Sequence, residues 1–297
     1  MKCANIRSNF RGDKERSIRV VILTSSTTAN VYLVNQLLQR HDIVGIVIES
    51  PPPALTKEDK WLRRRRMLRK YGLLKTLNKL AFNWLRSRFV GAAEANIIRE
   101  QFFPNARPVE YRRQVPSINV SNINDADADR FIRTQSPDLI AVCGTSLIKP
   151  EVFTLAPLGA VNIHTGITPD YRSADPIFWA IYNNQPNKVG VTIHFVDKGI
   201  DTGAVIHQER VPLYCTDCIA SIYSRCIQAG ARLYLQALDE MAANSLQTLD
   251  RPTARGKAFY SINLGILQYL IFLLRFRRLK RALPMETLTD AAAGSRS

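Results

Sequence analysis

Residues 161–176 read VNIHTGITPDYRSADP, a short β-like run that ends in a sharp turn. Alternate residues of a strand face the same side, so Asn162 and His164 project together while Val161 and Ile163 face a core. One Gly and two Pro follow within a dozen residues and end the strand. Ligands of an open parallel α/β sheet bind beyond the carboxyl ends of its strands. The amide and the imidazole are therefore predicted to stand where chemistry takes place.

The segments before and after this stretch alternate between strand and helix patterns. The β-branched runs 18–26 and 42–50 flank a helical pattern that starts at Thr27 or Thr28, and such a unit implies a parallel sheet. The other predicted elements are a short strand within 115–125, strands at 137–144, 160–166, 190–197 and 203–213, and helices at 125–136, 175–185 and 216–244, the last capped by Thr216 or Asp217. The last two strands alternate apolar and polar residues, so we expect them to pair antiparallel at one edge of an α/β sheet.

Length and composition indicate one large folded unit. The chain has 297 residues, of which 46% are apolar, so it can bury a sizeable core. We assign residues 17–245 to one domain with a basic helical insert at 54–103, followed by an amphipathic basic tail at 246–297. The net charge of +16 indicates anionic partners such as nucleic acid, anionic lipid or a phosphorylated substrate.

Cysteine usage and hydropathy bear on the compartment and on metal sites. Five scattered cysteines, Cys3 among them, are typical of reduced thiols in a cytosolic protein. Cys215 and Cys218 form a lone C-x-x-C, and a zinc site needs about four ligands, so we expect no metal site. The polar N-terminus lacks a secretory signal, and the longest apolar run, 262–274, is shorter than the ~20 residues that span a bilayer. We therefore expect a cytoplasmic protein.

A second polar cluster, VDKGIDTG, occupies residues 196–203. Asp197 and Asp201 accompany two glycines that permit a tight loop. A carboxylate can orient an imidazole or move its proton, and an amide can donate to a developing oxyanion. Together with Asn162 and His164, these groups suit attack by an amine on a carbonyl carbon. From these residues alone a structural role stays open, because most histidines in strands are structural.

Two longer stretches resemble the folate-dependent formyltransferases, which include the glycinamide ribonucleotide, methionyl-tRNA and sugar N-formyltransferases. They read VNIHTGITPDYRSADPIFWAIYNN and KVGVTIHFVDKGIDTGAVI. The shared motifs are an Asn-x-His strand, a P-x-Y-R turn, a G-V-T-x-H strand and a G-x-D-T-G loop, with Asp201 placed 37 residues after His164. The resemblance extends over 139–213 and, less fully, 17–50. It does not include 54–115 or the tail.

The resemblance implies a Rossmann-like formyltransferase fold, a mostly parallel twisted sheet with helices on both faces. It implies 10-formyltetrahydrofolate as formyl donor and a primary amine as acceptor. Asn162, His164 and Asp201 take the positions of the family's catalytic trio. The implied donor-binding residues lie in loops 143–150 and 196–201 and are Gly144, Ser146, Leu147, Ile148 and Asp197. The implied acceptor contacts are Thr165, Tyr171 and Arg172.

Two residues near this site need separate treatment. Many members of the resembled family read Y-R-G where this chain has Ser173 as the third residue. A Ser is tolerated there if its φ is negative. His194 faces the same side of its strand as Thr192, and we expect it to have a structural, hydrogen-bonded role. Support of the site from behind is the alternative for His194.

The segments outside the resembled core indicate which acceptor to expect. Methionyl-tRNA enzymes carry an added β-rich C-terminal domain, whereas the end of this chain is helical and basic. We therefore expect an amino sugar, nucleotide- or lipid-linked, that is destined for a surface glycan. Methionyl-tRNA is the alternative acceptor, and it predicts salt-sensitive tRNA binding. A non-catalytic RNA- or membrane-binding module with a degenerate core is an alternative of another class; it predicts losses within the trio, which this sequence does not show.

Two basic segments imply an anionic partner. Residues 60–70 carry seven cations and residues 273–281 carry five. Such runs are usually solvated helix faces, but like charges at this density repel one another unless an anion lies nearby. Interleaved Leu and Trp favour peripheral contact with an anionic membrane through 60–70 and 262–281, the latter as a helix in the membrane plane. Packing of 262–274 in the core or in a homodimer is the alternative.

Overall fold

The structure is a computed structural model that describes residues 17–50, 56–249 and 256–285. Three features discussed above lie wholly or partly outside these ranges: Cys3, the start of the insert and parts of the tail. None of the helices within the described ranges is long and apolar enough to cross a membrane.

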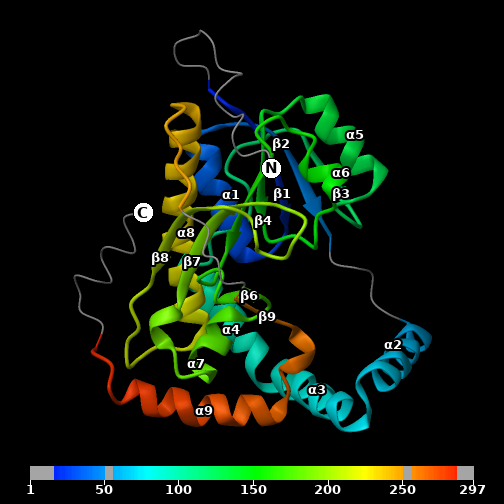
Figure 1. The fold of residues 1–297 in the computed structure, drawn as a ribbon, viewed down its shortest axis with the longest axis vertical. Coiled ribbons are helices and arrows are strands. Elements are labelled where there is room, and N and C mark those ends of the chain that lie inside the picture. Colours follow the sequence, from blue (N-terminus) through cyan, green and yellow to red (C-terminus); the bar gives the residue numbers. More distant parts are fainter. Residues whose placement is uncertain (1–16, 51–55, 250–255, 286–297) are drawn as a thin grey trace.

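One central sheet contains seven strands. They are β1 (Arg19–Ser25), β2 (Asp42–Glu49), β3 (Ser117–Val120), β4 (Leu139–Cys143), β5 (Ala160–His164), β7 (Gly190–Phe195) and β8 (Val205–Arg210). Their order in space is β3–β2–β1–β4–β5–β7–β8 (Figure 1). The first five of these run parallel, and β7 is antiparallel to both β5 and β8. The predicted mostly parallel sheet, with an antiparallel pair at one edge, is confirmed.

Helices cover both faces of this sheet. The α-helices are α1 (Thr28–Arg40), α2 (Lys57–Tyr71), α3 (Leu73–Leu85), α4 (Gly91–Phe102), α5 (Ala126–Gln135), α6 (Pro150–Phe153), α7 (Pro176–Tyr182), α8 (Ile219–Ala242) and α9 (Ile266–Lys280), and shorter turns are η2 (Arg86–Val90), η3 (Pro186–Lys188) and η4 (Ser261–Asn263). Val20 and Ile22 of β1 pack with α1 and α8, whereas Val21 and Leu23 pack with α5 and α6. Thr27 caps α1, as predicted. Alternation along β1 thus supplies two separate cores.

The long helix α8 begins later than the sequence predicts. Thr216 or Asp217 as its cap is wrong, because Cys218 is the N-cap. The Asp217 carboxylate instead accepts hydrogen bonds from the Tyr214 N–H at 2.7 Å and from the Ser221 hydroxyl at 2.7 Å. These bonds use Asp217 to fix the turn that precedes the helix.

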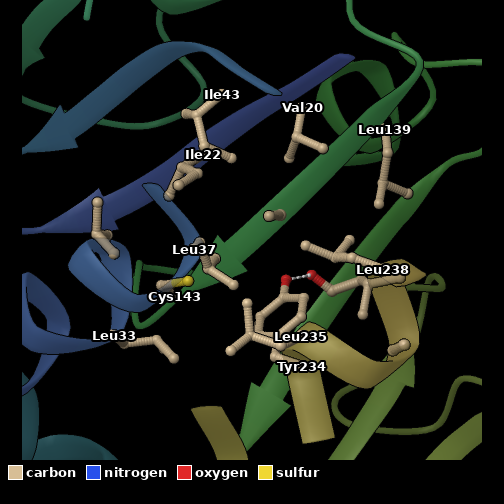
Figure 2. Close-up of a cluster of buried hydrophobic side chains, with 14 of the residues drawn as sticks. Val20, Ile22, Leu33, Leu37, Ile43, Leu139, Cys143, Tyr234, Leu235 and Leu238 are labelled. Carbon is tan, nitrogen blue, oxygen red and sulfur yellow. Dashed lines mark hydrogen bonds between the residues drawn. The ribbon is translucent and has the colours of Figure 1, made fainter. Parts of the chain in front are cut away.

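Tyr234 of α8 fixes the strand that carries the candidate site. Its hydroxyl donates to the Val161 carbonyl at 2.6 Å and accepts from the Val142 N–H at 2.9 Å. The side chain lies within the apolar cluster shown in Figure 2, between the sheet and its covering helices. Since Val161 immediately precedes Asn162, α8 holds β4 and β5 where the polar residues begin.

The insert and the tail pack on one another. α3 and α9 lie at one end of the molecule (Figure 1), and the Asn78 amide of α3 donates to the Gln268 side chain of α9 at 3.0 Å. Phe272 of α9 is 2% exposed, and its ring stacks on Phe178 of α7 with centroids 4.7 Å apart. The tail therefore packs on the core through one face of α9, as one of the two interpretations of 262–274 predicts.

A second, two-stranded sheet joins the tail to the site. It pairs β6 (Tyr171–Ser173) in parallel with β9 (Lys257–Phe259). The Tyr171 and Phe259 rings stack with centroids 5.2 Å apart. The sequence does not predict this sheet, because its strands are three residues long and far apart along the chain.

Candidate active site

The predicted catalytic residues meet at the carboxyl end of β5. Asn162 and His164 lie two residues apart on this strand, and the loop between β7 and β8 brings Asp201 beside them. His164 Nδ1 lies 3.6 Å from Asp201 Oδ2, and the two side chains are 9% and 13% exposed. Because water is largely excluded, the electrostatic interaction of the carboxylate with this ring is only weakly screened.

His194 of β7 lies between Asn162 and Asp201. Its Nε2 is 3.3 Å from Asn162 Nδ2 and 3.5 Å from Asp201 Oδ1. Its Nδ1–H donates to the Phe195 carbonyl at 2.8 Å, so Nε2 of the neutral ring accepts from the Asn162 amide. His194 stands beside Asn162 because β7 pairs with β5, a neighbour relation that the sequence does not predict. The residue expected in a structural role therefore connects the predicted trio.

His164 is held in one tautomer. Its Nε2 lies 2.8 Å from the Tyr171 carbonyl oxygen, so Nε2 carries the hydrogen and donates it. Nδ1 of the neutral ring is then able to accept a proton. Burial lowers the pKa of His164 below its ordinary value, although the Asp201 carboxylate acts to raise it. A neutral imidazole whose charged form would face a carboxylate suits a general base.

Asp201 is ionised in this setting. Burial acts to raise its pKa, but the neighbouring His194 and His164 side chains and the Ser173 N–H outweigh burial and lower the pKa to about 2. The Ser173 N–H donates to Asp201 Oδ2 at 2.8 Å. The site thus contains a fixed negative charge surrounded by two imidazoles.

The first predicted donor-binding loop, residues 143–150, follows β4. Val142 of β4 is the register partner of Asn162, so the loop begins directly beside the strand of the trio. Gly144 has a φ of +70°, and a Cβ at this position would lie 2.7 Å from the Asn30 side-chain nitrogen. Both the backbone conformation and the close approach require glycine here.

The remaining predicted donor contacts lie in two loops that local hydrogen bonds hold in place. The Glu49 carboxylate accepts from the Ser146 N–H at 2.7 Å and from its hydroxyl at 2.6 Å. Leu147 is 68% exposed beside it, while Ile148 packs partly buried against the core. Asp197 accepts hydrogen bonds within its own loop. An apolar side chain exposed on a fixed loop beside the trio fits a flat heterocyclic donor such as a folate.

Comparison with known families assigns the chain. The Formyl transferase family model matches residues 89–238, half of the chain. The chain belongs to this family. Methionyl-tRNA formyltransferase of Pelotomaculum thermopropionicum is 32% identical over 142 residues, which are 48% of this chain and 45% of that protein. The chain spans about half the length of the curated relatives that it matches.

Two solved structures show the same fold as this formyl transferase family member. Glycinamide ribonucleotide transformylase 1 from Symbiobacterium toebii matches with a TM-score of 0.51 and 17% identity over 79% of this chain and 95% of that chain. Phosphoribosylglycinamide formyltransferase from Anaplasma phagocytophilum matches with a TM-score of 0.50 and 16% identity over 82% and 100%. The expected Rossmann-like formyltransferase fold is confirmed.

The predicted acceptor contacts of this formyl transferase family member lie in different settings. Thr165 lines a cavity beside the trio. Tyr171 is 2% exposed, and its hydroxyl donates to Gln185 at 2.6 Å. Arg172 donates to two backbone carbonyls at 3.1 and 2.7 Å, one in the loop of Asp201 and one just before β9. Tyr171 and Arg172 are therefore held within the fold, whereas Thr165 borders a cavity.

Ser173 has a left-handed backbone. Its φ is +73°, so the negative φ under which a Ser is tolerated at this position is not present. A residue with a side chain in this region costs roughly 1–3 kcal/mol of strain, which surrounding structure must offset. The conformation directs the Ser173 N–H at Asp201. Strain at Ser173 therefore serves the placement of the carboxylate.

Within the described ranges, the C-x-x-C pair does not belong to a group of side chains that could hold a metal ion. There, the structure contains no group of three or more His, Cys, Asp and Glu side chains that could hold a metal ion. Cys215 and Cys218 are free thiols. Burial raises the pKa of the Cys226 thiol to about 12, so this cysteine is protonated and unreactive.

Proposed function

We propose that this chain transfers a formyl group from 10-formyltetrahydrofolate to a primary amine. The observation that carries the proposal is the buried network of Asn162, His194, Asp201 and His164 in a member of the formyl transferase family. It combines an ionised carboxylate, a neutral imidazole and an amide donor. Attack by an amine on a carbonyl carbon requires these groups.

Each side chain has a role that its geometry supports. The amine nitrogen bonds to the formyl carbon, and the bond from that carbon to the donor nitrogen breaks. His164 Nδ1 accepts the proton that the amine loses, and Asp201 Oδ2, 3.6 Å away, stabilises the resulting imidazolium. Asn162 uses one amide hydrogen for His194 and directs the other at the formyl oxygen, where negative charge develops. Transfer of the proton to the departing donor nitrogen gives a formamide and tetrahydrofolate.

Activity measurements on single variants test the proposal. His164→Ala and Asn162→Ala should each lower kcat by about 10²–10⁴-fold without loss of folding. His207→Ala is the matched control, because His207 pairs with Glu240 at 2.9 Å outside the network. The assay detects gain of one formyl group by mass spectrometry on amino-sugar nucleotides, aminated lipids and methionyl-tRNA. Wild-type turnover in both His164→Ala and Asn162→Ala would show that the proposal is wrong.

We propose an amino sugar as the acceptor. The cavity beside the trio has the Thr165 hydroxyl and the Asp175 carboxylate in its lining, and both suit a hydroxylated ring. Methionyl-tRNA is the second candidate, because the curated relatives above bear that name and the net charge is +16. Formylation of methionyl-tRNA and of no amino sugar, with tRNA binding that weakens steeply with salt, would select the second candidate.

We further propose that the protein works at the cytoplasmic face of an anionic membrane. Leu270 and Leu274 of α9 are 51% and 67% exposed. Arg278 and Arg281 follow Leu274 by four and seven residues, so they share its side of the helix. Phe272 on the opposite side is buried. This arrangement supports a helix that lies in the membrane plane with its leucines in the bilayer and its cations among anionic headgroups.

Vesicle sedimentation tests the membrane proposal. Each cation near an anionic surface contributes ~1 kcal/mol, which salt attenuates. At low salt the wild-type protein should sediment together with phosphatidylglycerol vesicles. The double variant Leu270→Glu/Leu274→Glu should stay in the supernatant. Leu249→Glu is the control, because Leu249 is 53% exposed and lies outside α9. Wild-type protein in the supernatant at low and high salt would show that the membrane proposal is wrong.

A further inference from the structure

A cavity beside the trio is enclosed by the insert, the tail and two helices of the central fold. Its volume is about 300 Å³. Phe82 of α3, Ile98 of α4 and Tyr269 of α9 contribute to its walls. Phe82 and Tyr269 lie outside the residues that the family model matches. The segments that set this chain apart from the family core therefore shape the cavity.

The cavity lies close to His164. Thr165, which lines the cavity, directly follows His164. Pro176 also lines it, and a Cβ added to Gly166 would lie 2.6 Å from Pro176 Cβ and 2.7 Å from His164 Nε2. Only the space of one small residue thus separates the cavity wall from His164. A ligand in the cavity therefore lies close to the imidazole of His164.

The charges of the lining do not suit a diphosphate. Among the lining residues, which all belong to the described part of the chain, Arg86 is the one cation, and it pairs with Glu94 at 3.2 Å. Asp175 adds a carboxylate, which interacts with Lys79 of α3. The wall also includes the start of α8, where the Asp217 carboxylate already lies beside the helix N-terminus. Diphosphate groups bind to unpaired Arg and Lys side chains and to free helix N-termini, so a nucleotide is disfavoured here.

The lining of the cavity is mostly apolar, and the helices α3 and α9, which form part of it, also expose apolar side chains. The Phe82 and Tyr269 rings have centroids 5.5 Å apart and close the cavity toward α3 and α9. On their outer sides these helices expose large side chains, among them Leu74 at 84% and Leu267 at 60%. An apolar chain that leaves the cavity between these helices would meet further apolar surface before it met water.

We propose that the cavity holds an apolar chain attached to the acceptor, so that the substrate is a lipid-linked amino sugar rather than a nucleotide-linked one. The sugar, with its amine, lies beside Thr165 and Asp175, and the chain lies among the apolar side chains of the lining. The proposal rests on the proposed formyl transfer and specifies its substrate class. The Thr165 hydroxyl and the Asp175 carboxylate suit the sugar, and the apolar majority of the lining suits the chain.

Binding measurements with matched ligands test the cavity independently of catalysis. Calorimetry on the full chain compares the decyl and methyl glycosides of one amino sugar, and the decyl glycoside should bind about tenfold more tightly or better. Val90→Phe and Ile98→Phe each place a larger side chain in the lining and should remove most of this preference. Val109→Phe, at a position 37% exposed outside the lining, should keep it. Equal binding of both glycosides to the wild type, or an unchanged preference in both filled variants, would overturn the proposal.

Formyl transfer to the same ligands separates the two levels of inference. We expect the decyl glycoside to have a higher kcat/KM than the methyl glycoside or the same sugar linked to a nucleoside diphosphate. If the wild type binds the decyl glycoside selectively but formylates none of the three, formyl transfer is wrong while the cavity assignment stands. If the nucleotide-linked sugar is the best substrate and its KM is unchanged in Val90→Phe and Ile98→Phe, the cavity assignment is wrong while formyl transfer stands.

Discussion

Replacement of Asp201 by Asn tests the central interaction of the site. The change removes a negative charge that lies 3.6 Å from His164 Nδ1 and keeps the size of the side chain. The Ser173 N–H can donate to the amide oxygen as it does to the carboxylate, so the loop should keep its place. We therefore expect Asp201→Asn to fold normally and to lose most of its transferase activity.

The size of this loss follows from the separation of the charges. Two unit charges 3.6 Å apart interact by about 4–5 kcal/mol at an effective dielectric constant of about 20. The dipole of the new amide and reorganised solvent recover part of that energy. We expect the imidazolium of His164 to lose about 3 kcal/mol of stabilisation, which corresponds to a fall in kcat on the order of a hundredfold.

The pH profile separates this effect from a loss of folding. Wild-type kcat/KM should rise with pH through the lowered pKa of His164 and then level off, because the neutral ring is the base. The Asp201 carboxylate acts to raise that pKa, so Asp201→Asn should move the rise to lower pH. Asp239→Asn is the matched control, because Asp239 pairs with Arg40 at 3.0 Å outside the site. An unchanged kcat and an unmoved profile in Asp201→Asn would refute the reasoning.

Three further substitutions are tested by thermal unfolding. Ser173→Gly should raise the free energy of unfolding by about 1 kcal/mol, because Gly adopts a φ of +73° without strain; a lowered Tm would contradict this. Tyr234→Phe should lower the free energy of unfolding by about 1–3 kcal/mol, because two buried backbone groups lose the tyrosine hydroxyl as hydrogen-bond partner. An unchanged Tm would show that these bonds are dispensable. Phe272→Ala should lower the free energy of unfolding by about 3–5 kcal/mol, whereas the control Leu274→Ala, at an exposed position, should change it little. Equal effects of the two substitutions would show that α9 does not pack through Phe272.

The parts of the site that the sequence predicts are those that depend on local pattern. Asn162 and His164 share a side of β5 because they are two residues apart, whatever packs around the strand. The position of His194 depends instead on which strand lies next to β5. A pairing between distant segments is decided by the whole fold, so β7 could be recognised as a strand without revealing that His194 would meet Asn162.

The cavity and the backbone conformation of Ser173 also depend on tertiary packing, so the sequence does not predict them. Phe82 and Tyr269 come together only because α3 packs on α9, and helical patterns of this kind do not reveal their partners. The left-handed φ of Ser173 contradicts the preference of its residue type. A residue adopts a backbone conformation that its type disfavours only where tertiary contacts offset the energetic cost. Such conformations are expected at functional sites.

The strand β6 ties the tail to the chemistry of the site. The Tyr171 carbonyl fixes the tautomer of His164, and the Ser173 N–H holds Asp201, so β6 contacts both residues of the central His164–Asp201 pair. β6 is in turn held by its pairing with β9 and by Arg172, which donates to the backbone on both sides. β9 lies outside the residues that the family model matches. The tail is therefore a structural part of the site: through β9 it helps to hold β6 where the Tyr171 carbonyl and the Ser173 N–H contact His164 and Asp201.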